Sequence, residues 1–247
     1  MLYDIMTVFW RDWLVLKRRL GKFILSRMIA PLLYLVAFGW GLGRSIQIAQ
    51  GGSYLDFLVP GILALNSMNI SFSGVGPPLH TSRMYHKTLE EYLVAPIRPL
   101  AFVIGKVLSG MTRGLISSVI IIALAYCFGA HFQITPLFVS VLTINCIIFA
   151  ALGFVVAMLI DSHEDMGSFN TYVLLPMSFL CGTFFATDKL PSLIHSFLMM
   201  LPLTHVSSGL RSIAMGGEIA LSSVCVLLFY MLLLLGLGIW TIHRVRK

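Results

Sequence analysis

Six long apolar segments that carry very few charges constrain this chain more than any other feature of its sequence. They cover residues 23–43, 57–79, 100–128, 136–160, 169–185 and 220–242. A helix needs about 20 mostly apolar residues to cross the hydrocarbon core of a membrane. Charged residues make up only 11% of the 247-residue chain, whereas soluble domains carry roughly 25%. The sequence therefore predicts an all-α polytopic membrane protein, a single transmembrane domain over residues 1–247 with six transmembrane helices.

Basic residues gather beside the same ends of these predicted spans. Of the 17 Lys and Arg residues, six lie within residues 11–27, five within 83–113 and three within 244–247. The remaining three are Arg44, Lys189 and Arg211. Because Lys and Arg accumulate on the cytoplasmic side of membrane proteins, we expect both termini to be cytoplasmic. Topology thus accounts for the net charge of +7, and no nucleic-acid partner is needed to explain it.

Residues 1–22 are predicted to form an amphipathic helix that does not cross the membrane. Apolar side chains recur at helical spacing along one face, at Leu2, Ile5, Met6, Phe9, Trp13, Leu16 and Leu20. The opposite face carries Asp4, Thr7, Arg11, Arg18 and Lys22. This pattern is typical of a helix that lies in the membrane interface. The alternative is a solvated helix beside the membrane.

Residues 186–217 lie between the fifth and sixth predicted spans and contain two short halves. Pro191 begins the first half, Pro202 separates the halves, and Gly216 and Gly217 end the second. Each half is too short to cross the membrane. A crossing by either half would also move the basic C-terminus to the other side. We therefore expect an external re-entrant half-helix hairpin.

A short charged stretch, residues 80–99, separates the second and third predicted spans. Thr88 followed by Glu91 fits a capping box, and Pro96 and Pro99 end the helix within two turns. A helix this short is marginal by itself and needs a surface to pack on. That surface is either the membrane and neighbouring helix ends, or a groove on a separate cytoplasmic protein. In the second case the contact residues would be Lys87, Thr88, Leu89, Glu90, Glu91, Tyr92 and Leu93.

Several segments occur in an order that resembles the permease subunits of ABC-2-type exporters. They are FLVPGILALNSMN from Phe57, KTLEEYLVAPI from Lys87, GKVL from Gly105 and EDMGSFNTYVLLPMSFLCGTFF from Glu164. The resemblance covers residues from about 55 to 215. One departure is Leu201-Pro202, where the family often has Asn-Pro.

This resemblance implies a homodimer of six-span permeases that sits on two copies of a cytoplasmic ATP-binding subunit, in a bacterial-type cytoplasmic (inner) membrane. It implies that residues 1–22 form the interface helix, that residues 88–95 form the coupling helix that contacts the ATPase, and that residues 186–217 form external half-helices. The implied activity is export of a lipid-linked saccharide, a lipid or an amphipathic small molecule.

Motifs for nucleotide binding and catalysis are missing from the sequence. It contains no GxxxxGKS or GxxxxGKT phosphate-binding loop, no HExxH and no GxSxG. The acidic stretch 161–165 is expected to be a solvated loop rather than a metal site. We therefore expect a chain that is not an enzyme and holds no cofactor, with ATP and Mg²⁺ bound by the partner subunit.

Lys106 and Arg113 are basic residues on one face of the third predicted span. Lys106 can extend to the cytoplasmic interface. Arg113 lies deeper, where a charge is costly and normally faces a partner, a cavity or a lipid headgroup. Both are thus candidates for facing substrate or lipid, with snorkelling or structural pairing as the alternative. Three buried amides are expected to hydrogen-bond across helices: Asn66, Asn69 and Asn145.

The main rival interpretation is a secondary transporter or channel that works without an ATPase. Such proteins commonly use carboxylates inside the membrane for ion coupling. Here the acidic residues fall at span ends or in loops, at positions that include Asp56, Glu90, Glu91, Asp161 and Glu218. A third class, a membrane enzyme or assembly scaffold, lacks a catalytic constellation. The sequence favours the permease.

Overall fold

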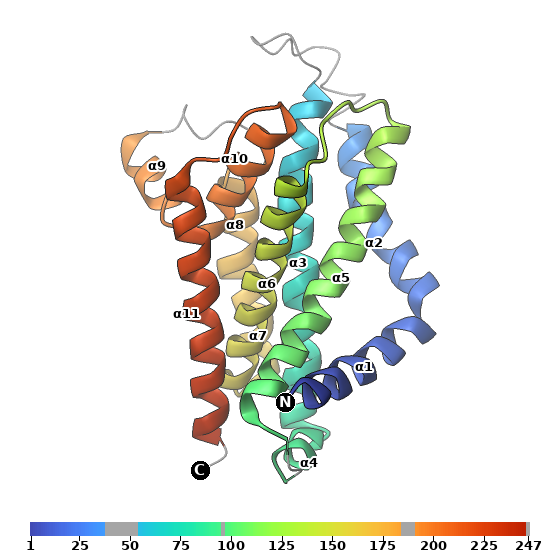
Figure 1. The fold of residues 1–247 in the computed structure, drawn as a ribbon, viewed down its shortest axis with the longest axis vertical. Helices are drawn as coiled ribbons and strands as arrows, with labels where there is room; N and C mark the ends of the chain where they lie inside the picture. Colours follow the sequence, from blue (N-terminus) through green and yellow to red (C-terminus); the bar gives the residue numbers. More distant parts are fainter. Residues whose placement is uncertain (38–53, 95–96, 184–190, 246–247) are drawn as a thin grey trace.

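The computed structural model describes residues 1–37, 54–94, 97–183 and 191–245. Within these ranges all regular secondary structure is helical, and the long helices run side by side as a bundle (Figure 1). The elements are α1 (Leu2–Arg18), α2 (Leu20–Tyr34), α3 (Tyr54–Met84), α4 (Thr88–Val94), α5 (Pro99–Cys127), α6 (Pro136–Leu159), α7 (His163–Phe169), the π-helical η2 (Asn170–Leu174), α8 (Leu175–Leu180), α9 (Ser192–Leu198), α10 (Pro202–Ala214) and α11 (Leu221–Val245).

Five helices in the described part of the chain are long and apolar enough to cross a membrane. They are Leu20–Ala37, Tyr54–Met84, Pro99–Cys127, Pro136–Leu159 and Leu221–Arg244. These helices match the first four and the last of the six predicted spans, and they confirm the all-helical membrane fold. The predicted fifth span overlaps α7, η2 and α8, which follow one another without a gap. Residues 38–43 of the first predicted span and 184–185 of the fifth lie outside the described residues.

Helix α3 is the centre of the bundle, because α5, α6 and α10 all pack against it. Amide side chains fix these contacts. The Asn66 Nδ2 donates to Ser117 Oγ of α5 at 2.7 Å, and Asn145 Nδ2 of α6 donates to Ser67 Oγ at 2.8 Å. Both bonds confirm the predicted cross-helix role. The third amide, Asn69, instead donates to Leu65 of its own helix at 3.1 Å.

Glycines on α5 allow the helices to approach closely. A Cβ atom at Gly110 would lie 2.5 Å from Val75 Cγ2 of α3 and 2.8 Å from Ala150 Cβ of α6. A Cβ atom at Gly114 would lie 2.7 Å from Cys146 Sγ. Such distances exclude any side chain, so α5 rests on α3 and α6 with little between the backbones.

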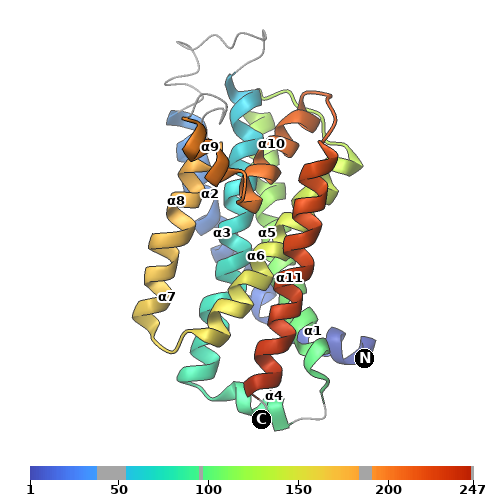
Figure 2. The same ribbon diagram turned by 90° about the vertical axis from the view of Figure 1, so that its left-hand side faces the viewer.

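The two ends of the bundle carry different short helices. The N-terminus, α4 and the C-terminal end of α11 gather at one end, whereas α9 and α10 lie at the other (Figures 1 and 2). In α10, residues such as Leu203, Val206 and Leu210 are fully buried. Two short helices joined at residues 199–201 thus occupy the described part of the predicted hairpin, residues 191–217. Residues 186–190 lie outside the described residues, and the cytoplasmic placement of the termini stays a prediction.

Candidate functional site

Helix α1 lies across the start of α5 (Figure 1). Val8 is only 1% exposed, and a Cβ atom at Gly105 of α5 would lie 2.8 Å from Val8 Cβ and 3.1 Å from the Ile5 carbonyl oxygen. The amphipathic helix predicted for residues 1–22 therefore exists, but it ends at Arg18 and α2 begins two residues later.

The apolar residues that were predicted to share one face of this helix differ in their exposure. Ile5 and Leu16 of the predicted face pack inward together with Val8, but Leu2 and Met6 are exposed. A separate exposed apolar strip runs along α1 and consists of Tyr3, Met6, Trp10 and Leu14. Periodicity identifies an apolar side of a helix but does not show which part of that side other helices cover.

The charged contact between α1 and α5 joins Asp12 to Lys106. The Lys106 Nζ donates to both carboxylate oxygens of Asp12, at 2.8 and 3.0 Å. The two side chains are only 13% and 12% exposed. Arg11 Nη1 lies 3.6 Å from the same carboxylate and is half exposed. The sequence analysis did not predict an ion-pair role for Asp12. Its spacing of four residues from Val8 and from Leu16 places it on the buried face of α1.

Helix α4 rests on this contact through its own apolar side. Leu89 is 3% exposed, and the Tyr92 ring centroid lies 5.0 Å from that of Phe102. The Arg11 Cζ and the Lys106 Nζ lie 5.5 and 5.8 Å from the Tyr92 ring centroid. Burial also raises the pKa of the Tyr92 phenol, so this side chain stays neutral. Leu89 and Tyr92 thus contact their own chain.

The outward side of α4 is charged. Its exposed residues include Lys87, which immediately precedes the helix, and also Glu90, Glu91 and Val94. Val94 is 88% exposed. The side chain of Leu93 lies outside the described part of the structure. A partner approaching α4 would therefore meet the carboxylates of Glu90 and Glu91 and the Lys87 ammonium group beside Val94.

The predicted capping box at the start of α4 was wrong. Thr88 is the first helical residue, not the residue before the helix, and its hydroxyl hydrogen-bonds the Ser82 hydroxyl of α3. Lys87 takes the preceding position with a φ of 52°, a left-handed conformation that is uncommon outside glycine. The tight turn from α3 brings the Thr88 hydroxyl to the Ser82 hydroxyl, and the spacing of residues alone cannot reveal this contact.

A second ion pair at the same end connects α3 to the loop after α6. Arg83 Nη2 pairs with Asp161, and Arg83 Nη1 donates to the carbonyls of Ala157, Met158 and Ile160 at 3.2, 2.7 and 3.2 Å. These carbonyls belong to the last turn of α6 and the residue after it, where helices lack intrahelical donors. Within the described ranges, no group of three His, Cys, Asp or Glu residues could hold a metal ion.

Arg113 lies two helical turns further along α5 than Lys106. Its Nη1 donates to the Gly74 carbonyl of α3 at 3.1 Å. Its Nε is buried and has no hydrogen-bond partner among the described residues, and no carboxylate of the described residues lies within ion-pair distance. Lys106 and Arg113, which the sequence presents as similar, therefore have different surroundings: Lys106 has a carboxylate and Arg113 has a carbonyl.

Residues 3–215 match the family described as ABC-2 type transporter. The chain belongs to this family. It is 27% identical to the inner membrane transport permease YadH of Escherichia coli (strain K12), over 74% of this chain and 72% of that protein. It is 28% identical to nodulation protein J of Rhizobium leguminosarum bv. viciae, over 89% and 85%, and 24% identical to nodulation protein J of Bradyrhizobium diazoefficiens, over 82% and 78%. With its apolar helices, the chain is a multi-pass ABC-2 permease of the inner membrane.

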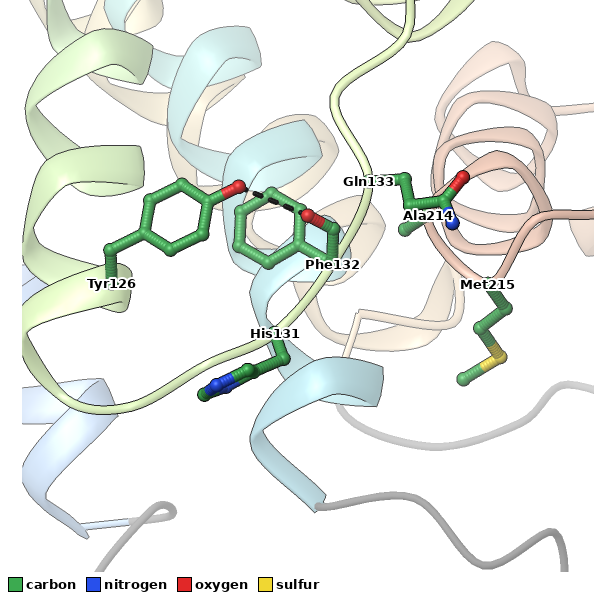
Figure 3. Close-up of a pocket in the computed structure, with 6 residues that line it drawn as sticks. All are labelled: Tyr126, His131, Phe132, Gln133, Ala214 and Met215. Atoms are coloured by element: carbon green, nitrogen blue, oxygen red, sulfur yellow. Dashed lines mark hydrogen bonds between the residues drawn. The ribbon is translucent and has the colours of Figure 1, made fainter.

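The far end of this ABC-2 permease contains a hollow that the sequence did not predict. It measures about 500 Å³ and lies between the end of α5, the loop that follows it and the end of α10 (Figure 3). The residues around it are Tyr126, His131, Phe132, Gln133, Ala214 and Met215. The Tyr126 hydroxyl donates to the Phe132 carbonyl at 3.0 Å, and their rings stack at 5.2 Å. The hollow is open and lies far from α4.

Proposed function

We propose that this permease is the transmembrane subunit of an ATP-driven exporter, which moves a lipid-linked saccharide, a lipid or an amphipathic small molecule across the cytoplasmic membrane. A separate ATPase subunit supplies the energy. ABC-2 permeases generally work with ATP-binding subunits. The observation that carries the proposal for this chain is α4, which presents charged side chains outward at the end of the bundle that also holds the N-terminus.

The proposed ATPase contact uses the outward side of α4. Glu90 and Glu91 favour a partner groove with a basic rim, since opposite charges steer two surfaces together. Lys87 and Val94 lie beside them. Leu89 and Tyr92 were also predicted to contact the ATPase. In this proposal they instead hold α4 in place against its own chain. ATP and Mg²⁺ bind to the partner in this proposal.

The proposed assembly is a homodimer of six-span permeases with two ATPase subunits. An even number of spans puts both termini on one side, and the N-terminus and the end of α11 do lie at the same end of the bundle as α4 (Figure 2). Membrane lipids are the proposed neighbours of the exposed strip on α1. The residues at the corner after this strip are exposed and basic, which suits an anionic membrane surface: Lys17, Arg18, Arg19 and Lys22.

Arg113 is the residue proposed to face cargo or lipid headgroups. Its guanidinium holds a charge within the span with only a carbonyl as a described partner, and such charges usually serve function. Lys106 was predicted for the same role, but its ammonium group is engaged by Asp12. Replacing Arg113 with Leu should abolish cargo-stimulated ATP hydrolysis in the reconstituted complex. Unchanged stimulation at normal protein levels would exclude the role.

Co-purification tests the proposed function. The tagged permease, extracted in mild detergent, should carry a nucleotide-binding subunit with it, and Glu90→Lys with Glu91→Lys should reduce the recovered amount about ten-fold. A matched control is Glu164→Lys with Asp165→Lys, which reverses two exposed carboxylates at the start of α7. If the wild-type permease never binds a nucleotide-binding protein, the secondary transporter or channel becomes the better interpretation.

A further inference from the structure

The contact between Asp12 and Lys106 carries a consequence for α4. Both side chains are mostly buried, and both carboxylate oxygens accept a hydrogen bond from the ammonium group. Two charges are taken out of water only when each compensates the other, and removal of one leaves a buried charge without a partner. Neutralising Asp12 would therefore drive the Lys106 ammonium toward water.

Tyr92 of α4 lies next to this ion pair. Its ring is 5.8 Å from Lys106 Nζ and 5.5 Å from Arg11 Cζ, and Lys106 Nζ is also 5.8 Å from the Phe102 ring. A cation near an aromatic ring attracts it. The place of Tyr92 therefore depends on α1, which supplies Asp12 and Arg11, and on α5, which supplies Lys106 and Phe102.

Helix α4 has seven residues and is too short to persist without tertiary contacts. Leu89 is buried, the Tyr92 ring packs on Phe102, and the Thr88 hydroxyl ties the first turn to Ser82 of α3. If the Tyr92 ring loses its contacts with Phe102 and Lys106, we expect α4 to fray. A partner that binds α4 must then order the helix again. Ordering a loose segment on binding reduces affinity.

We propose that Asp12 and Lys106 are positioning residues that hold α4 folded and correctly oriented on α1 and α5, so that its carboxylates are ready to meet the ATPase. The part about the ATPase rests on the proposed function. The part about α4 concerns the permease alone and can be tested without a partner.

Hydrogen exchange on the purified permease in lipid nanodiscs is the first test. The amides of residues 88–94 should exchange about ten-fold faster in Asp12→Asn and in Lys106→Met than in the wild type. The double variant Asp12→Lys with Lys106→Asp should return to the wild-type rate, and so should Lys106→Arg. Matched controls that should change nothing are Asp4→Asn and Lys17→Met, on exposed or partly exposed positions of α1.

Two outcomes of this test would overturn the proposal. One is wild-type exchange of residues 88–94 in both single variants. The other is faster exchange throughout α11 as well, because the ion pair would then hold the whole fold rather than α4.

Affinity for the co-purifying ATPase is the second test. The dissociation constant should rise about ten-fold in each single variant, equivalent to about 1.4 kcal/mol, and the charge-swapped variant should recover it. Loosened α4 with unchanged affinity would overturn the positioning role. Absence of any ATPase binding by the wild type would instead overturn the proposed function, while the exchange result on α4 would still stand.

Discussion

The two ends of the bundle are held together by different chemistry. At the α4 end, charged side chains of different helices and loops pair with each other, Asp12 with Lys106 and Arg83 with Asp161. Arg83 also donates to three carbonyls at the end of α6, so this end combines both kinds of contact. At the α9–α10 end, polar side chains bond mainly to backbone carbonyls. Arg211 donates to the carbonyls of Phe57 and Gly182 at 3.2 and 2.8 Å.

Other bonds at the α9–α10 end follow the same rule. The Tyr230 hydroxyl donates to the Met200 carbonyl at 2.7 Å, and Ser207 donates to the Cys181 carbonyl at 2.6 Å. A backbone carbonyl carries no titratable charge and moves only with its backbone. Two paired side chains can separate by rotamer changes and form other contacts. We infer that bonds to backbone carbonyls fix the α9–α10 end, whereas the ion pairs at the α4 end can be rearranged.

The largest expected effect comes from Arg211→Met. This change removes two charge-assisted hydrogen bonds and a guanidinium that lies 3.6 Å from the Phe57 ring centroid. The free energy of unfolding, measured by titration with SDS, should fall by about 3 kcal/mol. The two described acceptors are backbone carbonyls, which no substitution removes. A loss below about 1 kcal/mol would show that the backbone contacts do not fix this end.

A smaller loss is expected from Arg83→Met at the α4 end. Its Nη1 covers the end of α6, so the change should lower the free energy of unfolding by about 2 kcal/mol and speed amide exchange after Val156. Asp161→Asn should cost less than about 1 kcal/mol, because the Asp161 side chain is 74% exposed and its ion pair is screened by water. Equal losses in the two variants would mean that the ion pair, rather than the carbonyls, holds α6.

His205 tests whether side-chain pairs also matter at the α9–α10 end. Its Nε2 lies 2.8 Å from the Met199 carbonyl and its Nδ1 lies 3.0 Å from Ser223 Oγ. Ser223→Ala, which removes the side-chain partner alone, should lower the free energy of unfolding by about 1 kcal/mol. His205→Phe removes the carbonyl bond as well and should cost more. The reverse order would contradict the dominance of backbone acceptors.

The smallest effect is expected from salt. Raising the ionic strength from about 0.1 M to 1 M shortens the screening length from about 10 Å to 3 Å. Exchange of the α4 amides should rise slightly, because Arg11 is half exposed, whereas exchange in α10 should not change. An equal rise in the amide exchange rates of α4 and α10 would contradict the proposed electrostatic difference between the two ends.

The sequence predicted the positions of the helices better than the contacts between their side chains. The apolar runs placed the long helices, because helix length is a local property. Residues 88–94 are helical as predicted, whereas Ala95 and Pro96 of the predicted helix end lie outside the described residues. The ion pair of Asp12 could not be predicted from local sequence, since its partner Lys106 follows 94 residues later. Thr88 was misassigned for a related reason: its hydroxyl meets Ser82 across a turn whose shape the spacing does not show.

The contact of α1 with Gly105 and Lys106 also bears on how the protein is made. During synthesis α1 emerges before α5, and the residues on which it rests follow about 10 s later at ordinary rates of translation. Until α5 enters the membrane, the Asp12 carboxylate has no ammonium partner and Val8 has no glycine to rest on. If the proposed lipid contact of the exposed strip Tyr3, Met6, Trp10 and Leu14 holds, this strip would bind the nascent helix to the membrane surface in the meantime. The order of synthesis thus separates the emergence of α1 from its docking, because docking can begin only after the start of α5 has been made.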